Sequence, residues 1–271
     1  MVRDITIGQY YPGKSLLHKM DPRVKIVLTL LFIVVIFLCK NFWSLGLMAA
    51  FLFGGICISG VPVKMLLKSL KAILLIVFIT AMLNLFYATG GKTLLDLGFV
   101  KITDKGVYTA IFMTVRISCL ITGSSLMTYT TTPTMLTDAI ERLLSPLKVF
   151  HVQVHTLAMM MTLALRFIPT LIEEIDKIMN AQKARGADLE SGNLIDRARA
   201  LVPILVPLFV SSFRRAYELA FAMECRCYTG GNNRTRMKQM KLSVLDFGFV
   251  CGALILLAGV FLLNHFFVNL I

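Results

Sequence analysis

Two arginines near the ends of predicted helices are the residues of this chain best suited to bind a partner. Arg185 stands in Ala184-Arg185-Gly186 and Arg226 in Cys225-Arg226-Cys227, so each guanidinium has small neighbours on both sides. Small neighbours let a guanidinium enter a groove, and its planar fork suits paired hydrogen bonds to a carboxylate. A cation at a helix C-terminus is also an ordinary ending, which the helix dipole favours by about 0.3 to 1 kcal/mol. The occurrence of an arginine with small neighbours at a second helix end favours a binding role.

Other polar residues offer weaker chemistry. His151 and His155 have the i, i+4 spacing of a metal-ligand pair, but the glutamate of a zinc hydrolase motif is missing, so we interpret them as surface histidines. Arg116 is the lone charge deep in a predicted span, where a charge is usually paired or functional unless its side chain reaches the end of the helix. Five more charged residues could pair if their helices cross, with solvated surface charge as an equal alternative. They are Glu173, Glu174, Asp176, Arg214 and Arg215.

The composition indicates that membrane helices position these residues. Of the 271 residues, 57% are hydrophobic and 16% are charged, and the mean hydropathy is +0.77. Several stretches reach the roughly 20 apolar residues that a bilayer core of about 30 Å requires. We predict an all-α integral membrane protein with a polar N-terminal arm and a small hairpin between residues 91 and 105. The five predicted spans are 24–39, 43–60, 72–90, 106–130 and 244–267.

The middle of the chain is predicted to form a domain of long, crossed amphipathic helices outside the bilayer. Between His151 and Gly186, apolar residues recur every three or four positions on one helical face and polar residues recur on the other. Such a helix lies at the edge of a membrane or against partner helices. The apolar run from Leu201 to Phe213 has thirteen residues, which is short for a span. The predicted domains are 1–130 with the arm and four spans, 131–243 with the crossed helices, and 244–271 with the last span.

The distribution of lysine and arginine predicts the orientation. Twenty-three of the 28 lie in the N-terminal arm, in residues 61–71 and in residues 131–243, whereas the loops on the other side hold four. Lysine and arginine accumulate in loops that stay in the cytoplasm. The N-terminus and the crossed helices are therefore expected in the cytoplasm. The two arginine-bearing helix ends at residues 184–186 and 225–227, called the arginine tips below, would then lie in one compartment.

The residues argue against catalysis by this chain. Gly91-Lys92-Thr93 imitates the end of a phosphate-binding loop, but Phe86 stands where that motif needs glycine. A secondary transporter usually has acidic or histidine relays within its spans, and a membrane-embedded enzyme needs converging nucleophile, base or metal ligands. Neither set is visible, although both classes stay open as alternatives. We expect no enzymatic activity, no metal and no cofactor.

With these residues in view, the chain resembles the transmembrane coupling (T) component of energy-coupling-factor (ECF) transporters, which are ABC-type vitamin importers. The resemblance extends over nearly the whole chain. Of the family's two Ala-Arg-Gly-like motifs, residues 184–186 match fully and residues 225–227 match at the arginine alone. Further similar stretches are Gly8-Gln9-Tyr10 to Ser15, His18, Asp21-Pro22-Arg23-Val24-Lys25, residues 164–170, Glu173-Glu174 and residues 181–186.

The resemblance implies a non-catalytic energy-coupling subunit in the cell membrane. Each arginine tip would dock with one of two ATPase subunits, and the apolar faces of the crossed helices would hold a separate substrate-binding membrane subunit. ATP-driven closure of the ATPases would move the tips, and the crossed helices would pass that motion to the substrate-binding subunit. The transported substrate would be a vitamin or other micronutrient chosen by that other polypeptide, and nucleic acid is not an expected partner.

Overall fold

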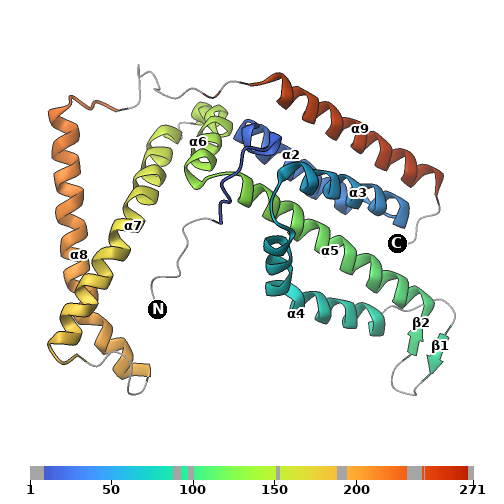
Figure 1. The fold of residues 1–271 in the computed structure, drawn as a ribbon, viewed down its shortest axis with the longest axis horizontal. Coiled ribbons are helices and arrows are strands. Elements are labelled where there is room, and N and C mark those ends of the chain that lie inside the picture. Colours follow the sequence, from blue (N-terminus) through green and yellow to red (C-terminus); the bar gives the residue numbers. More distant parts are fainter. Residues whose placement is uncertain are drawn as a thin grey trace. The chain divides into compact units, whose positions relative to one another are not determined.

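The protein folds into helices grouped in two compact units, as seen in a computed structural model (Figure 1). The structure describes residues 9–87, 93–96, 101–150, 153–187, 194–230, 240 and 242–267. The bundle unit takes in the described residues from 9 to 139 and from 240 to 267. The long-helix unit takes in those from 140 to 230. The prediction of an all-α membrane protein is confirmed.

The helices of the bundle unit occupy the positions predicted for the five spans. Strands β1 (Thr93–Asp96) and β2 (Lys101–Thr103) pair antiparallel and form the hairpin predicted between residues 91 and 105. Helix α6 (Pro133–Leu143) is divided between the two units after Ala139. The other helices are α1 (Leu16–Lys19), α2 (Pro22–Leu38), α3 (Phe42–Ser59), α4 (Val63–Tyr87), α5 (Asp104–Thr130) and α9 (Val244–Phe266).

Length and composition support part of the predicted topology. Helices α3, α5 and α9 are long and apolar enough to cross a membrane, and so is α4 if its segments Val63–Lys71 and Ile73–Phe86, bent by 59°, count as one span. Helix α2 is shorter, with 17 residues. The two long helices that the sequence places outside the bilayer also pass by length and composition. Their location outside the bilayer therefore stays a prediction.

Local sequence explains where α2 begins and where α3 ends. The Asp21 side chain accepts a hydrogen bond from the backbone N–H of Arg23 at 2.9 Å, and Pro22 occupies the first turn of α2. This is the helix start predicted from the Asp-Pro pair, because proline has no N–H to leave unpaired. At the end of α3, Gly60 takes a φ of 67°, a left-handed conformation that favours glycine.

The core of the bundle unit lies among α2, α3, α5 and α9. Phe112 and Ile36 are among its fully buried side chains. Gly123 lets α5 approach α2 closely, since a Cβ at this position would lie 2.5 Å from the ring of Phe32. Many side chains on the outer surfaces are also large and apolar, such as Phe53, which is 67% exposed. Helices that are apolar on all sides suit a bundle surrounded by lipid.

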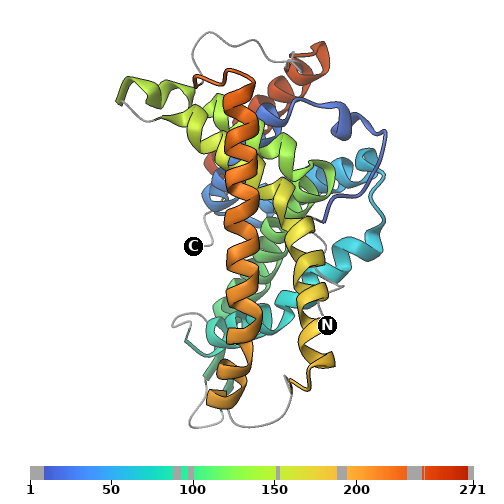
Figure 2. The ribbon, with the colours of Figure 1, turned by 90° about the vertical axis from the view of Figure 1, so that its left-hand side faces the viewer.

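The long-helix unit is built on α7 (Val154–Ala184) and α8 (Leu194–Cys225), preceded by the 3₁₀ helix η1 (Ser145–Phe150). Helices α7 and α8 run in opposite directions (Figures 1 and 2). Gln182 Nε2 donates to the Pro203 carbonyl at 3.3 Å near one end of the pair. At the other end, the hydroxyl of Tyr228 lies 2.9 Å from the sulfur of Met159. The two helices therefore form an antiparallel pair.

Candidate functional site: two arginine-tipped helix ends

Helix α7 ends in a hydrogen-bonded turn that favours glycine. Gly186 has a φ of 84°, and its N–H donates to the Lys183 carbonyl at 3.0 Å. The N–H of Ala187 donates to the Gln182 carbonyl at 3.0 Å. Together these bonds form a Schellman motif, which satisfies carbonyl groups that a helix end leaves free. Arg185 is the C-cap residue of this motif.

Helix α8 ends in the same motif although glycine is missing. The N–H of Cys227 donates to the Glu224 carbonyl at 2.8 Å, and the N–H of Tyr228 donates to the Met223 carbonyl at 3.0 Å. Cys227 takes a φ of 55°, the left-handed conformation that costs a residue with a Cβ about 1 to 2 kcal/mol. Arg226 therefore has the same place in its motif as the arginine of α7.

Both tips are open to a partner. Neither Arg185 nor Arg226 forms a side-chain hydrogen bond or ion pair within the described part of the chain. Because α7 and α8 are antiparallel, the two tips lie at opposite ends of the pair, roughly 30 to 40 Å apart at a helical rise of about 1.5 Å per residue. Each guanidinium can offer its five N–H donors. The exposed tip residues are Ala184, Arg185, Gly186, Cys225, Arg226 and Cys227.

Of the five residues predicted to pair between the long helices, the structure brings Glu174 and Arg215 together. Arg215 Nη2 lies 3.5 Å from Glu174 Oε2, and the Ser211 hydroxyl donates to Glu174 Oε1 at 3.2 Å. The two charged side chains keep 32% and 29% of their surface exposed, so the ion pair contributes only about 0 to 1 kcal/mol. Within the described residues no ion pair is formed by the other three, Glu173, Asp176 and Arg214.

Arg116 is buried in the bundle unit, and no described carboxylate pairs with it. Its Nη2 donates to the carbonyl of Cys39, the C-cap residue of α2, and its guanidinium carbon lies 4.6 Å from the centroid of the Phe112 ring. The negative end of the α2 dipole and the face of the ring both favour a cation. Its Nε is buried with no partner among the described residues. Arg116 thus lies level with the end of α2 and joins α5 to it.

Of the candidate histidine pair, the structure describes only His155. His155 Nδ1 lies 3.1 Å from Glu141 Oε1, and this contact engages one of the two ring nitrogens. His151 lies outside the described residues. In the part of the chain that the structure describes, no three histidine, cysteine or acidic side chains come together as metal ligands would.

A buried polar cluster in the bundle unit was not predicted. Asp246 Oδ1 accepts from the backbone N–H of Asp21 at 2.9 Å, and its Oδ2 accepts from the N–H of Ser243 at 2.7 Å. Lys25 Nζ donates to the Thr130 carbonyl at 2.9 Å. The side chains of the three ionisable residues are buried. The spacing Ser243-Val-Leu-Asp246 is that of a capping box, and it is the sequence pattern that could have predicted the contact between Asp246 and Ser243.

This cluster fixes two further points of the bundle unit to α2. Lys25 binds the end of α5, just before the chain continues into α6. Arg23 Nη2 lies 2.8 Å from Asp21 Oδ2 and donates to the carbonyl of Met240 at 3.3 Å, just before α9. The stretch Asp-Pro-Arg-Val-Lys therefore joins the end of α5 and the approach to α9 to the start of α2.

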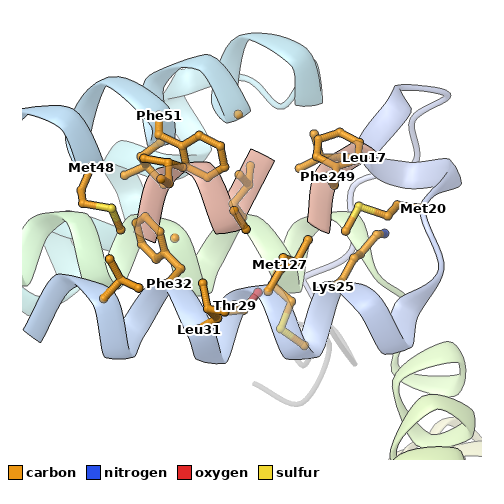
Figure 3. Close-up of a pocket in the computed structure, with 18 of the residues that line it drawn as sticks. Leu17, Met20, Lys25, Thr29, Leu31, Phe32, Met48, Phe51, Met127 and Phe249 are labelled. Atoms are coloured by element: carbon orange, nitrogen blue, oxygen red, sulfur yellow. The ribbon is translucent and has the colours of Figure 1, made fainter. Parts of the chain in front are cut away.

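An apolar cavity of about 130 Å³ lies next to the cluster, among α2, α3, α5 and α9 (Figure 3). Phe32, Phe51 and Phe249 line its sides, and Lys25 stands at one end. The described residues of its lining are mostly apolar and include no Asp, Glu or His.

Similarity to known proteins identifies the family of this chain. Residues 13–237 match the family described as CbiQ, cobalt transport protein. The chain is 54% identical over 246 residues to the energy-coupling factor transporter transmembrane protein EcfT of Ruminiclostridium cellulolyticum, covering 91% of this chain and 92% of that protein. The chain belongs to the family of ECF transporter T components. The resemblance noted from the motifs is confirmed.

Two further relatives support the assignment of this T component to the family. It is 55% identical over 248 residues to EcfT of Clostridium kluyveri, covering 91% of this chain and 92% of that protein. It is 43% identical over 264 residues to EcfT of Bacillus subtilis, covering 97% and 100%. The T component is therefore the transmembrane part of a transporter and works with the other subunits of that transporter.

Proposed function

We propose that this T component couples the motion of two ATPase subunits to a separate substrate-binding membrane subunit, and so drives uptake of a vitamin or other micronutrient. The observation that carries the proposal is the pair of Schellman motifs. Two different sequences place an exposed arginine at the same position of the same motif, at the two ends of one antiparallel helix pair. One tip would dock with each ATPase.

Docking would use the chemistry of the guanidinium group. Arg185 and Arg226 have no partner within the described residues, so each can donate paired hydrogen bonds to a carboxylate in a groove of an ATPase. The small residues beside each arginine would let it enter that groove. No group in this chain would act on ATP, which the ATPase subunits would hydrolyse.

The helix pair would convert ATPase closure into a change of its own geometry. When the two ATPases approach each other, the end of α7 and the end of α8 would shift relative to one another. The contacts between the helices include polar ones, such as Glu174 with Arg215 and Gln182 with Pro203. Because such exposed polar contacts are weak, they would oppose a change in the crossing of the helices only slightly.

The exposed apolar face of α8 would hold the substrate-binding subunit. Phe209, Phe213 and Phe221 are 66%, 64% and 60% exposed, and they recur every four or eight positions on one face. A contiguous exposed apolar surface marks an interaction site. A change in the crossing of α7 and α8 would move this surface and the subunit bound to it.

The proposal places both tips in the cytoplasm, where the ATPases act. The excess of lysine and arginine between residues 131 and 243 supports this orientation. The exposed thiols of Cys225 and Cys227 allow a direct test of the second tip. A membrane-impermeant maleimide should label them in inside-out vesicles and not in intact cells, and the same holds for Arg185→Cys in a variant without other exposed cysteines. Labelling of the two tips from opposite sides would overturn the proposal.

Docking is tested by reversing the charge of each tip. Arg185→Glu and Arg226→Glu should each reduce retention of the ATPases on the purified T component by at least about tenfold, because an unpaired charge would be left in the groove. The double variant should retain neither ATPase. Arg214→Glu, an exposed charge reversal near the middle of α8, is the matched control and should retain both. Normal ATPase retention by the double variant would exclude docking through these arginines.

A further inference from the structure

The first segment of α4, Val63–Lys71, carries a row of lysines that the proposed function does not use. Lys64, Lys68 and Lys71 are spaced i, i+4 and i+7, so they share one side of the helix. All three are exposed, and none forms an ion pair within the described part of the chain. No Asp or Glu occurs between residues 22 and 95, so this stretch of the sequence supplies no counter-charge.

The other sides of the segment are apolar. Leu66, opposite the lysines, is 3% exposed and packs into a cluster of the bundle unit that includes Tyr129. The Tyr129 hydroxyl donates to the carbonyl of Met65 at 3.2 Å and fixes the segment further. Val63 and Leu67, each 59% exposed, lie between the buried side and the lysine row. A helix with one side packed on the bundle, one exposed apolar side and one cationic side suits the membrane surface.

The place of the segment in the chain also puts it at the edge of the bilayer. Helix α3 is long enough to cross a membrane and ends at Ser59, and the segment begins four residues later at Val63. Gly60 makes the turn between them. Residues 73–86 then continue at 59° to the segment. The lysine row therefore lies within reach of the headgroups at the end of a span.

We propose that residues 63–71 form an interfacial helix that binds the phosphate groups of anionic phospholipids through Lys64, Lys68 and Lys71. Each ammonium acts as a compact point charge for phosphate, and its aliphatic stem lets it extend along the apolar edge to the headgroup level. One lysine near an anionic surface corresponds to about a fivefold preference for the anionic lipid. The bound lipids would hold the bend of α4 at the membrane surface. The proposal stands independently of ATPase docking.

Fluorescence quenching by brominated lipids tests the proposal on the full chain in vesicles. The protein has one tryptophan, so Trp43→Phe combined with Leu67→Trp places a single indole on the open edge of the segment. At equal mole fractions, brominated phosphatidylglycerol should quench this indole more than brominated phosphatidylcholine, with a preference of about fivefold or more. The preference should fall as salt is raised, because salt screens exposed charges.

Charge removal completes the test. Combining Lys64→Gln, Lys68→Gln and Lys71→Gln should bring quenching by the two lipids to the same level while the indole stays in contact with lipid. The matched control removes three exposed lysines elsewhere, with Lys14→Gln, Lys40→Gln and Lys105→Gln, and should keep the preference. Equal quenching by both lipids before charge removal would overturn the proposal. Absence of quenching by either lipid would do so too, because the segment would then face protein.

Discussion

The buried polar cluster of the bundle unit and the arginine tips of the long-helix unit hold charged residues in opposite environments. In the bundle unit, Asp21, Lys25 and Asp246 are 5%, 5% and 3% exposed and form hydrogen bonds with backbone groups. In the long-helix unit, Arg185 and Arg226 are exposed, with no partner among the described residues. A buried charge costs several kcal/mol unless it is paired or hydrogen-bonded, whereas an exposed charge costs little. The first group therefore maintains the fold, and the second is available to other subunits.

The largest effect is expected from breaking the buried cluster. Asp246→Ala leaves the backbone N–H groups of Asp21 and Ser243 without an acceptor, so the free energy of unfolding should fall by about 3 kcal/mol. Asp246→Asn keeps one acceptor oxygen and should lose less. Thermal unfolding of the purified protein in detergent measures both. Equal stability of Asp246→Ala and the wild type would show that the buried cluster does not hold the fold.

A smaller loss is expected at Arg116. Arg116→Leu removes the hydrogen bond to the carbonyl of Cys39 and the contact with the ring of Phe112, and should lower the free energy of unfolding by about 2 kcal/mol. Uptake by the fraction that folds should be preserved if the role is structural. A variant with normal stability and no uptake would instead assign Arg116 to the transport mechanism.

Replacing the residue that has a left-handed backbone conformation should change the stability of the two helix ends in opposite directions. Gly186→Ala forces a Cβ into a φ of 84° and should destabilise the end of α7 by about 1 kcal/mol. Cys227→Gly relieves the same strain and should stabilise the end of α8 by up to about 1 kcal/mol. Hydrogen exchange at the two helix ends measures both. Faster exchange after Cys227→Gly would contradict the shared motif.

The smallest effect is expected from the ion pair between the long helices. Glu174→Gln and Arg215→Gln should each change the free energy of unfolding by less than about 1 kcal/mol, and a double-mutant cycle should give a coupling in the same range. Uptake per ATP hydrolysed is the more informative measurement, because this pair joins the two helices that would carry motion. A coupling energy above about 3 kcal/mol would contradict this prediction, because that magnitude is typical of a buried ion pair.

Local patterns were sufficient to predict much of the bundle unit and both tips. Long apolar runs marked the positions of the span helices, because a bilayer demands about 20 apolar residues from each of them. The Asp21-Pro22 pair marked the start of α2, because a cap and a first-turn proline act within a few residues. The small neighbours of Arg185 and Arg226 marked the tips for the same reason. Hydropathy does not decide whether α7 and α8 cross the membrane, because amphipathic and membrane-crossing helices overlap in length and composition.

Sequence by itself therefore determined the helices, the exposed arginines and the family of this T component. Tertiary structure alone decided which distant groups meet. The hydrogen bond from Asp21 to Asp246 joins residues 225 positions apart, and the antiparallel pairing of α7 and α8 sets the tips at opposite ends. The left-handed conformation of Cys227 was equally hidden, because cysteine has no local preference for it. Local patterns specify elements through neighbours within a few residues, whereas these contacts depend on how the elements pack.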